Sequence, residues 1–240
     1  MSNNVSILST IQLEQPLIER AMQAGVHLDI IPFIQIVDIS DSSELQEKIG
    51  QLYKEKTTVI FTSTNAVYAV CEHPNFGHPD WNIYCIENAT MKAVLEYFPE
   101  ERIIGKATDS ETLTTEILKN KNIKNITFFC GDKRMDTLPD ALQKERITIN
   151  EVVVYTTIET PVFAAKDYDG ILFNSPSAVS SFFSMNLLDE HTVLFAIGKS
   201  TAKSLQKECD NKLIISDIAT KKGVLETAIA YFEKHKTNQL

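Results

Sequence analysis

Small polar side chains gather at two turns of this sequence, about half a chain apart. Residues 59–70 read VIFTSTNAVYAV and residues 171–182 read ILFNSPSAVSSF. In both, an apolar run typical of a buried strand leads into Ser, Thr and Asn, which favour the start of a helix. Such a turn presents free backbone N–H groups, hydroxyl donors and the positive end of the helix dipole. The chemistry expected there is the binding of an anion, and a carboxylate fits such a lining well.

Two more turns of this kind occur in YCIENAT (84–90) and LFAIGKST (194–201). Helix capping would account for one hydroxyl at each turn, and it remains the alternative for any single residue. Capping does not explain why several donors gather at each of the four turns. The candidate ligand-binding residues at these turns are Thr62, Ser63, Asn65, Asn88, Thr90, Ser175, Ser177, Gly198, Lys199, Ser200 and Thr201.

Two further side chains could take part in the chemistry. Tyr155 lies in the strand-like run VVVYTT, and a phenol can donate a proton or a hydrogen bond at neutral pH. The alternative is an ordinary tyrosine of a strand. Arg134 lies in GDKRMD (131–136), directly after a strand-like run, where it could hold a carboxylate in a bidentate pair. The alternative for this segment is a solvated turn.

Several kinds of chemistry lack the motifs that they need. The sequence has no GxGxxG, no GxxxxGK[ST] and no GxSxG, which disfavours dinucleotide binding, P-loop chemistry and a serine hydrolase. Cys71, His73, His78 and Cys85 match no standard metal-ligand spacing. Their segment, EHPNFGHPDWN, is rich in Pro and Gly and is better explained as a surface loop. We therefore expect no metal.

The overall composition limits the partners and the compartment. The net charge of −9 argues against a nucleic-acid partner, and an anionic ligand would have to be held by local donors. No apolar run reaches the length of a membrane span, and no basic segment precedes a signal-like run at the N-terminus. The four cysteines are scattered without CxxC spacing, which is typical of a reduced protein of the cytoplasm.

The elements that must position these residues repeat along the chain. YCIENATMKAVLEYF (84–98) resembles LFAIGKSTAKSLQKE (194–208), and KATDSETLTTEIL (106–118) resembles IATKKGVLETAIA (218–230). With the opening pair, three successive strand–helix units recur at nearly constant spacing, which indicates a duplication. A fourth unit, residues 5–25, pairs more loosely with residues 126–146. Strands that alternate with helices in this way predict parallel sheets covered on both faces.

The chain could divide into tandem halves near residue 122 or into crossed lobes. Two long strand-like runs, residues 30–39 and 149–160, favour the crossed arrangement because they could pair as a ladder between lobes. The expected fold is α/β, with two Rossmann- or flavodoxin-like parallel-sheet lobes joined by a two-stranded β linker. The expected domains are residues 1–33 with 161–240 (lobe one), 40–150 (lobe two), and 34–39 and 151–160 (linker strands).

These segments together resemble the uroporphyrinogen-III synthase family. The likeness rests on an ordered set of motifs: FTSTNAV, GD…LPDAL, VVVYTT, DYDGILFNSPSAV, IGKSTAKSL and AT…GVLETAIAYF. Each motif is weak alone, but the set is fairly specific and covers about residues 5–233. The resemblance implies two α/β lobes on a two-stranded linker, with the N-terminal unit completing the lobe of the C-terminal half.

The resemblance also implies a reaction: cyclisation of the linear tetrapyrrole hydroxymethylbilane to uroporphyrinogen III, with inversion of ring D and loss of water. No cofactor is implied, and a monomer is expected. The enzyme's main task would be to hold its substrate, which carries eight carboxylates, in the geometry of attack. Tyr155 matches the tyrosine of the family's linker and is the candidate for assisting departure of hydroxide. Family positions that line the cleft are matched by Ser63, Thr90, Ser177, Ser200 and Thr201.

The sequence also departs from the family pattern. Ser9-Thr10-Ile11 stands where Thr-Arg-Pro is usual, and Glu87 replaces a frequent glycine, which Gly198 keeps in the second copy. Arg134 is one position from where an arginine commonly stands. These departures support one competing hypothesis, a non-catalytic two-lobe module that binds a polyanionic small molecule. A third class is a structural or partner-binding α/β protein, in which the serines of the turns would bind no ligand.

Overall fold

The computed structural model describes residues 5–72 and 77–236. His73 and part of the loop expected at 72–82 lie outside these residues. By its internal contacts the chain divides into two units: a first unit of residues 1–35 with 158–240, and a second unit of residues 36–157. No helix within the described ranges has the length and apolar character that a bilayer crossing needs.

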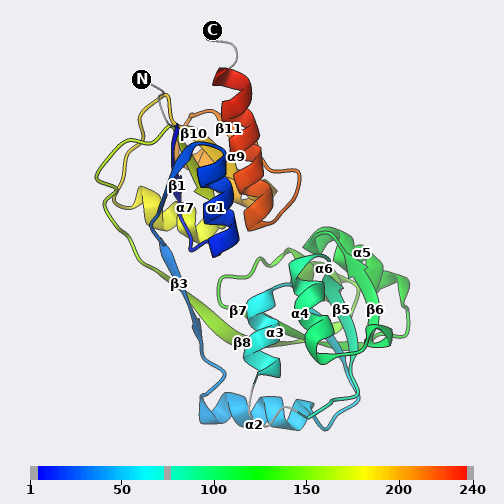
Figure 1. Cartoon of the computed structure of the whole chain (residues 1–240). Helices are drawn as coiled ribbons and strands as arrows, with labels where there is room; N and C mark the ends of the chain where they lie inside the picture. Colours follow the sequence, from blue (N-terminus) through cyan, green and yellow to red (C-terminus); the bar gives the residue numbers. More distant parts are fainter. Residues whose placement is uncertain (1–4, 73–76, 237–240) are drawn as a thin grey trace. The chain divides into compact units, whose positions relative to one another are not determined.

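The first unit is built on a five-stranded parallel sheet in the order β11-β10-β9-β1-β2. Figure 1 labels β1, β10 and β11 of this sheet. Strand β1 pairs directly with β9, with Leu8 opposite Ile171, so the N-terminal segment lies in the sheet of the C-terminal half. The strands are β1 (Val5–Ser9), β2 (Val26–Ile30), β9 (Gly170–Phe173), β10 (Val193–Ala196) and β11 (Leu213–Ile215). The helices are α1 (Gln15–Gln23), α7 (Pro176–Phe183), α8 (Lys199–Glu208) and α9 (Lys221–Lys236).

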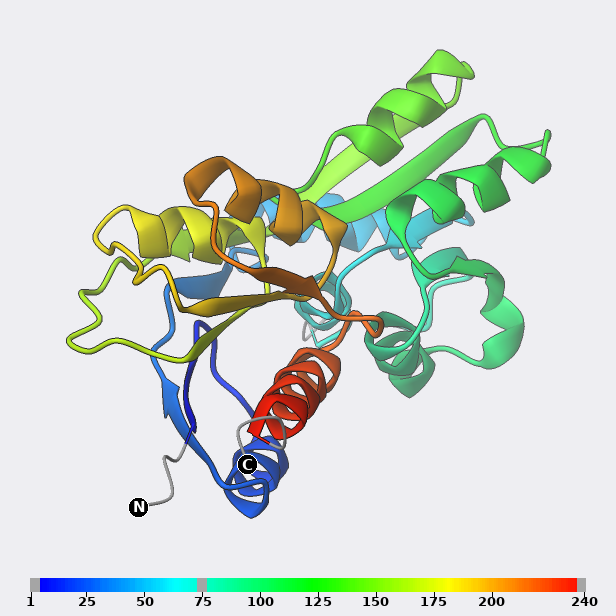
Figure 2. The same cartoon turned by 90° about the horizontal axis from the view of Figure 1, so that it is seen from above.

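Both faces of this sheet are covered, as a parallel sheet requires. Helices α1 and α9 lie side by side on one face, in blue and red, and α7 packs against α8 on the other (Figure 2). Successive residues of β9 alternate between the two cores: Leu172 packs with α1 and α9, whereas Ile171 and Phe173 pack with α7 and α8. This explains why β9 reads as a continuous apolar run.

The second unit carries a six-stranded sheet in the order β3-β8-β7-β4-β5-β6. The strands are β3 (Ile34–Asp38), β4 (Thr58–Phe61), β5 (Asn82–Ile86), β6 (Ile103–Ala107), β7 (Asn125–Gly131) and β8 (Thr148–Glu159). The helices are α2 (Ser43–Leu52), α3 (Thr64–Cys71), α4 (Ala89–Tyr97), the short η1 (Glu100–Arg102), α5 (Ser110–Lys119) and α6 (Thr137–Lys144). One core packs under α2, α3 and α4, and the other under α5 and α6.

Strands β3 and β8 connect the two units. The amide of Ile39 donates to the carbonyl of Val154, and the amide of Thr160 donates to the carbonyl of Phe33, so the two segments run antiparallel. The run expected at 30–39 is not one strand: β2 ends at Ile30 and β3 begins at Ile34. Pro32 lies in the break, where it has no N–H to give to a ladder, and Phe33 is fully buried.

The repeated sequence units form the same strand–helix units in space. The opening pair becomes β4 with α3 and β9 with α7, and the later pairs become β5 with α4 and β10 with α8, then β6 with α5 and β11 with α9. The predicted α/β fold, with two parallel-sheet lobes joined by two strands, is confirmed.

Candidate functional site

In each sheet there is a point on either side of which successive strands of the chain are added in opposite directions. In the second unit, β4, β5 and β6 lie to one side and β7 and β8 to the other, so the reversal falls between the neighbours β4 and β7. Ligands of open α/β sheets bind outside the carboxyl ends of the strands at such a switch point. Ser63 follows β4 there, and Gly131 ends β7.

Tyr155 reaches this switch point from β8, the strand beside β7. Its ring lies against the backbone of Gly131, because a β carbon on Gly131 would be 2.3 Å from the Cε2 atom of Tyr155 and 2.8 Å from its phenol oxygen. Burial raises the pKa of the Tyr155 phenol, and a side-chain hydrogen bond with Ser63 opposes part of that rise. The pKa lies above its ordinary value, so Tyr155 is a neutral phenol at physiological pH, the form that can donate a proton.

The first unit reverses between β1 and β9. The turn after β1 offers no free side chain: Ser9 and Thr10 are fully buried, and their hydroxyls donate to the carbonyls of Ile11 and Leu172, each at 2.7 Å. The turn after β9 differs, because the Nδ2 atom of Asn174 is buried without a hydrogen-bond partner within the described part of the chain. A buried donor left unpaired is costly, and an oxygen of a bound ligand would satisfy it.

Two of the predicted serines are used as helix caps. The hydroxyl of Ser63 accepts from the amide of Asn65 at 3.2 Å and caps α3, and the hydroxyl of Ser175 accepts from Ala178 at 3.1 Å and caps α7. Capping uses a lone pair and leaves the hydroxyl proton available. Ser175 can therefore cap a helix and still donate to a ligand, whereas the Ser63 hydroxyl is also hydrogen-bonded to the Tyr155 phenol.

The remaining predicted residues of the turns keep their side-chain donors free. Within residues 5–72 and 77–236, none of them makes a side-chain hydrogen bond or ion pair, and Gly198 can offer only its backbone. Thr90 and Thr201 occupy equivalent places in α4 and α8, and both are almost fully buried. The residues with free side-chain donors are Thr62, Asn65, Asn88, Thr90, Ser177, Lys199, Ser200 and Thr201.

Arg134 is already paired in this structure. Its guanidinium binds the carboxylates of Asp136 and Glu151, and it is mostly buried. Burial alone would lower the pKa of Arg134, but the two carboxylates outweigh it and raise the pKa, so the charge is held firmly. A substrate carboxylate could bind Arg134 only by sharing or displacing one of these partners, so its role as a clamp stays a prediction.

The backbone at Asn88 is strained. Asn88 precedes α4 with φ 65° and ψ −117°, and its side chain makes no capping bond. This combination lies outside the left-handed region that asparagine tolerates, and only glycine adopts it readily. Strain of this kind costs of order 1–3 kcal/mol, persists only where the surrounding structure holds it, and is often found at functional sites. The strain falls one residue after Glu87, which replaces the usual glycine.

We expect Asn88→Gly to increase the free energy of unfolding by about 1 kcal/mol, because glycine relieves the strain and only part of the gain is lost to its freedom in the unfolded chain. Asn88→Ala is the matched control, and it should destabilise because alanine tolerates a positive φ less well than asparagine. Urea unfolding of both variants measures the difference. Both should raise the KM if the Asn88 amide binds substrate. Equal stabilities of the two variants would contradict the strain.

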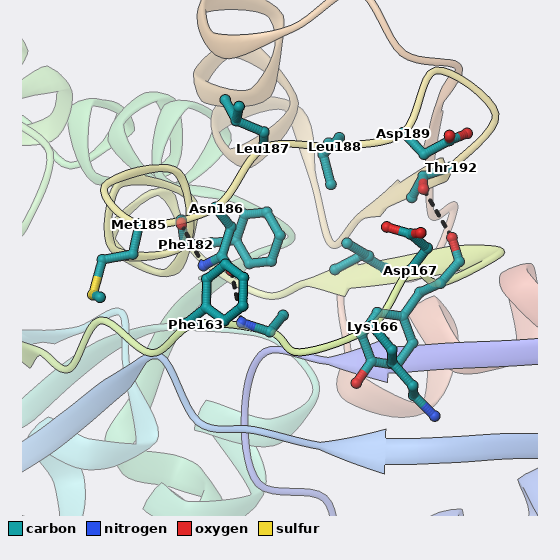
Figure 3. A pocket seen from close by; sticks show the side chains of 13 residues that line it. Phe163, Lys166, Asp167, Phe182, Met185, Asn186, Leu187, Leu188, Asp189 and Thr192 are labelled. Atoms are coloured by element: carbon teal, nitrogen blue, oxygen red, sulfur yellow. Dashed lines mark hydrogen bonds between the residues drawn. The ribbon is translucent and has the colours of Figure 1, made fainter.

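A cavity of about 330 Å³ lies elsewhere in the first unit. Figure 3 shows its lining, which comes largely from the loops before β9 and β10 and includes Phe163, Met185 and Leu187. The Asn186 amide binds these loops together: its Nδ2 donates to Val162 and Phe182, and its Oδ1 accepts from Ala164. The cavity is at the amino ends of the strands and contains none of the predicted site residues, so it is not the candidate site.

The geometry defines a class of protein. Two parallel sheets, each with polar turns at the carboxyl ends of its strands, and a neutral phenol at one switch point are typical of an α/β enzyme that binds an anionic small molecule. The family model for uroporphyrinogen-III synthase HemD matches residues 15–226. The chain therefore belongs to the uroporphyrinogen-III synthase family, whose members are cyclising lyases of tetrapyrrole biosynthesis.

Solved structures show the same fold. The crystal structure of uroporphyrinogen-III synthetase from Helicobacter pylori is 18% identical, covers 95% of this chain and 99% of its own, and superposes with a TM-score of 0.65. A mutant uroporphyrinogen III synthase from Thermus thermophilus is 12% identical. The match covers 96% of this chain and 99% of the Thermus chain, with a TM-score of 0.67. No curated protein is significantly similar to the chain in sequence.

Sequence reasoning missed part of this site. The sequence indicates Tyr155 as a candidate because it lies in a predicted linker strand. It does not indicate that Gly131 and Asp132 contact Tyr155 from the end of β7. The one available signal was the Gly-Asp pair directly after an apolar strand. A glycine in that position often marks a close approach of another group.

Proposed function

We propose that this chain converts hydroxymethylbilane to uroporphyrinogen III through the residues described above, with Tyr155 as the proton donor. The observation that supports it most directly is the neutral Tyr155 phenol at the second unit's switch point, bound to Ser63 and packed on Gly131. The proposal keeps the division expected from the sequence, with lobes 1–33 plus 161–240 and 40–150, and linker strands 34–39 and 151–160.

Substrate binding falls to local donors, because the chain carries a net charge of −9 and its overall field repels a polycarboxylate. The free hydroxyls and amides of the four turns, the helix N-termini and the unpaired Nδ2 of Asn174 provide these donors. The residues proposed to bind substrate are Thr62, Ser63, Asn65, Asn88, Thr90, Arg134, Ser175, Ser177, Gly198, Lys199, Ser200 and Thr201. Glu87 is a carboxylate among them, and it would repel the substrate unless it points away.

The chemical step begins at ring A of the substrate. Its C–O bond breaks, the electron pair leaves with the oxygen, and the Tyr155 phenol gives that oxygen a proton, so that water departs and the ring A azafulvene cation and a phenolate remain. Ring D then attacks through its substituted α carbon to form the spiro intermediate that rearranges to the type III ring. The phenol is restored by the proton that the substrate loses when the pyrrole becomes aromatic again. Because the free substrate closes without inversion, holding the substrate in the geometry of spiro attack is the larger part of the task.

The remaining parts of the proposal concern partners and location. The linear tetrapyrrole is the small-molecule partner, and the chain acts as a monomer, without a cofactor, a metal or nucleic acid. A cytoplasmic location is supported by Cys71, Cys85, Cys130 and Cys209, all of which are free thiols.

Product analysis tests the function. Purified protein incubated with hydroxymethylbilane should yield the type III isomer, separated from type I after oxidation to the porphyrins. Type I alone, formed at the spontaneous rate, would refute the synthase. The second candidate, a module that binds the tetrapyrrole without turnover, is favoured by the turn after β1, where Ser9 and Thr10 offer no free donor. It predicts binding of the substrate together with type I product only.

A further inference from the structure

The ladder between β7 and β8 changes register just before Tyr155. Cys130 pairs with Val153, but the next residue, Gly131, pairs with Tyr155, so Val154 is an extra residue of β8. Such a bulge sets two successive residues on one side of a strand and re-aims the side chain that follows. Accordingly, Val154 is fully buried in the core under α2, α3 and α4, and Tyr155 packs against the same core.

Gly131 leaves room for the re-aimed ring. A β carbon there would overlap the ring of Tyr155, at 2.3 Å from Cε2 and 2.4 Å from Cζ. Real contacts of a β carbon are never so short, so any other residue at position 131 would push the ring out of its place. Gly131 is therefore required because it has no side chain that would displace the Tyr155 ring, and not because of a special backbone conformation.

Asp132 binds strand β8 at Tyr155 and at the two residues that follow it. Its amide donates to the Tyr155 carbonyl at 3.2 Å, its Oδ2 accepts from the Thr156 hydroxyl at 2.7 Å, and its Oδ1 accepts from the Thr157 amide at 2.8 Å. Strand β7 ends at Gly131, so beyond this point the Asp132 carboxylate takes the place of a strand partner for β8.

The two donors suit a carboxylate. Burial raises the pKa of Asp132, but the hydrogen bonds from Thr156 and Thr157 outweigh it, so the pKa lies below its ordinary value and the group is ionised. An ionised carboxylate accepts at both oxygens. An asparagine keeps one acceptor for Thr157, and its NH₂ group can still meet the Thr156 oxygen, whereas an alanine keeps neither contact.

We propose that Asp132, together with Gly131, is a positioning residue that holds the Tyr155 phenol in place for proton donation. The inference rests on the proposed function of Tyr155. Asp132 binds the Tyr155 carbonyl and the two residues that follow it, Thr156 and Thr157. A displacement of about 1 Å at a reacting group can cost up to about 100-fold in rate. We expect Asp132→Ala to lower kcat for the type III product about 10-fold with little change in KM, and Asp132→Asn to restore most of it.

The test is a double-mutant cycle with Tyr155→Phe, in which kcat and KM are measured for type III formation. If Asp132 acts through Tyr155, Asp132→Ala has no further effect on kcat once the phenol is gone. Asp169→Ala is the matched control, because the Asp169 carboxylate also accepts from a backbone amide, that of Ser6 at 2.7 Å, at the amino end of β9. It should leave kcat unchanged.

The outcomes separate this inference from the function on which it rests. A wild-type protein that makes no type III isomer would refute the proposed function. An active wild type whose kcat is unchanged by Asp132→Ala, or is lowered equally with and without Tyr155, would overturn the positioning role. If Asp132→Ala does not fold, Thr156→Val is the second variant, because it removes one of the two donors to the Asp132 carboxylate. It must lower kcat when Tyr155 is present and have no further effect in the Tyr155→Phe variant.

Discussion

Replacing Tyr155 with phenylalanine should lower kcat for uroporphyrinogen III by about 10- to 100-fold, the range for loss of one positioned proton donor. The ring keeps its packing against Gly131 and the core, so the fold and the KM should change little. What is lost is the proton that converts the leaving oxygen to water. Spiro attack still follows whenever hydroxide departs without help, which is why the variant should retain measurable type III product.

The measurement is the initial rate of type III formation at saturating substrate, with type I product as the internal reference for spontaneous closure. Tyr53→Phe is the matched control, because the Tyr53 phenol donates to the carbonyl of Val70 at 2.5 Å within the same unit but belongs to no predicted site. It should lower the stability and leave kcat unchanged. A Tyr155→Phe variant with the wild-type kcat would remove Tyr155 from the mechanism.

Gly223→Ala should destabilise the protein by about 3 kcal/mol, at the upper end of the cost of overpacking. A β carbon on Gly223 would lie 2.1 Å from the carbonyl oxygen of Ile218. That oxygen cannot easily move, because it accepts from the Thr220 amide at 2.7 Å and from the Ser216 hydroxyl at 2.8 Å. The first turn of α9 would have to shift instead, and it carries the buried Val224 and Leu225.

Gly50→Ala is the control for this change, because it is the same substitution in a helix without the contact. Gly50 lies within α2, and a β carbon there meets nothing within 4 Å. It should stabilise the protein by about 0.5–1 kcal/mol, the ordinary advantage of alanine over glycine in a helix. Urea unfolding of the two variants should therefore give shifts of opposite sign. A Gly223→Ala variant as stable as Gly50→Ala would contradict the tight contact at Ile218.

The strand–turn–helix units could be predicted because local sequence determines them. Runs such as that of β9 are apolar at every position, and both faces of that strand are indeed covered. Ser63 and Ser175 begin helices as their residue types indicate. The same local rules could not decide whether the two hydroxyls cap helices or bind a ligand, since capping and ligand binding use the same residue types.

Features that depend on contacts between distant segments could not be predicted. The bulge at Val154 adds one residue to a ladder, and no turn residue marks it in VVVYTT. Arg134 was expected at the rim of a site, but its partner Glu151 comes from the next strand, where nothing in the sequence links them. The strain at Asn88 could not be predicted either. The sequence indicates a departure at Glu87, where glycine is usual, but the positive φ lies at the next residue.

The pairing of β1 with β9 also bears on the order in which the protein folds. The described strands and helices of the second unit lie between residues 34 and 159, so its sheet can close as soon as that stretch has left the ribosome. Strand β1 is made first, yet its neighbour β9 begins only at Gly170. A contact between segments so far apart in sequence forms slowly, because a long loop must close before it gains any stability. The unit that starts the chain is thus the one expected to finish folding last.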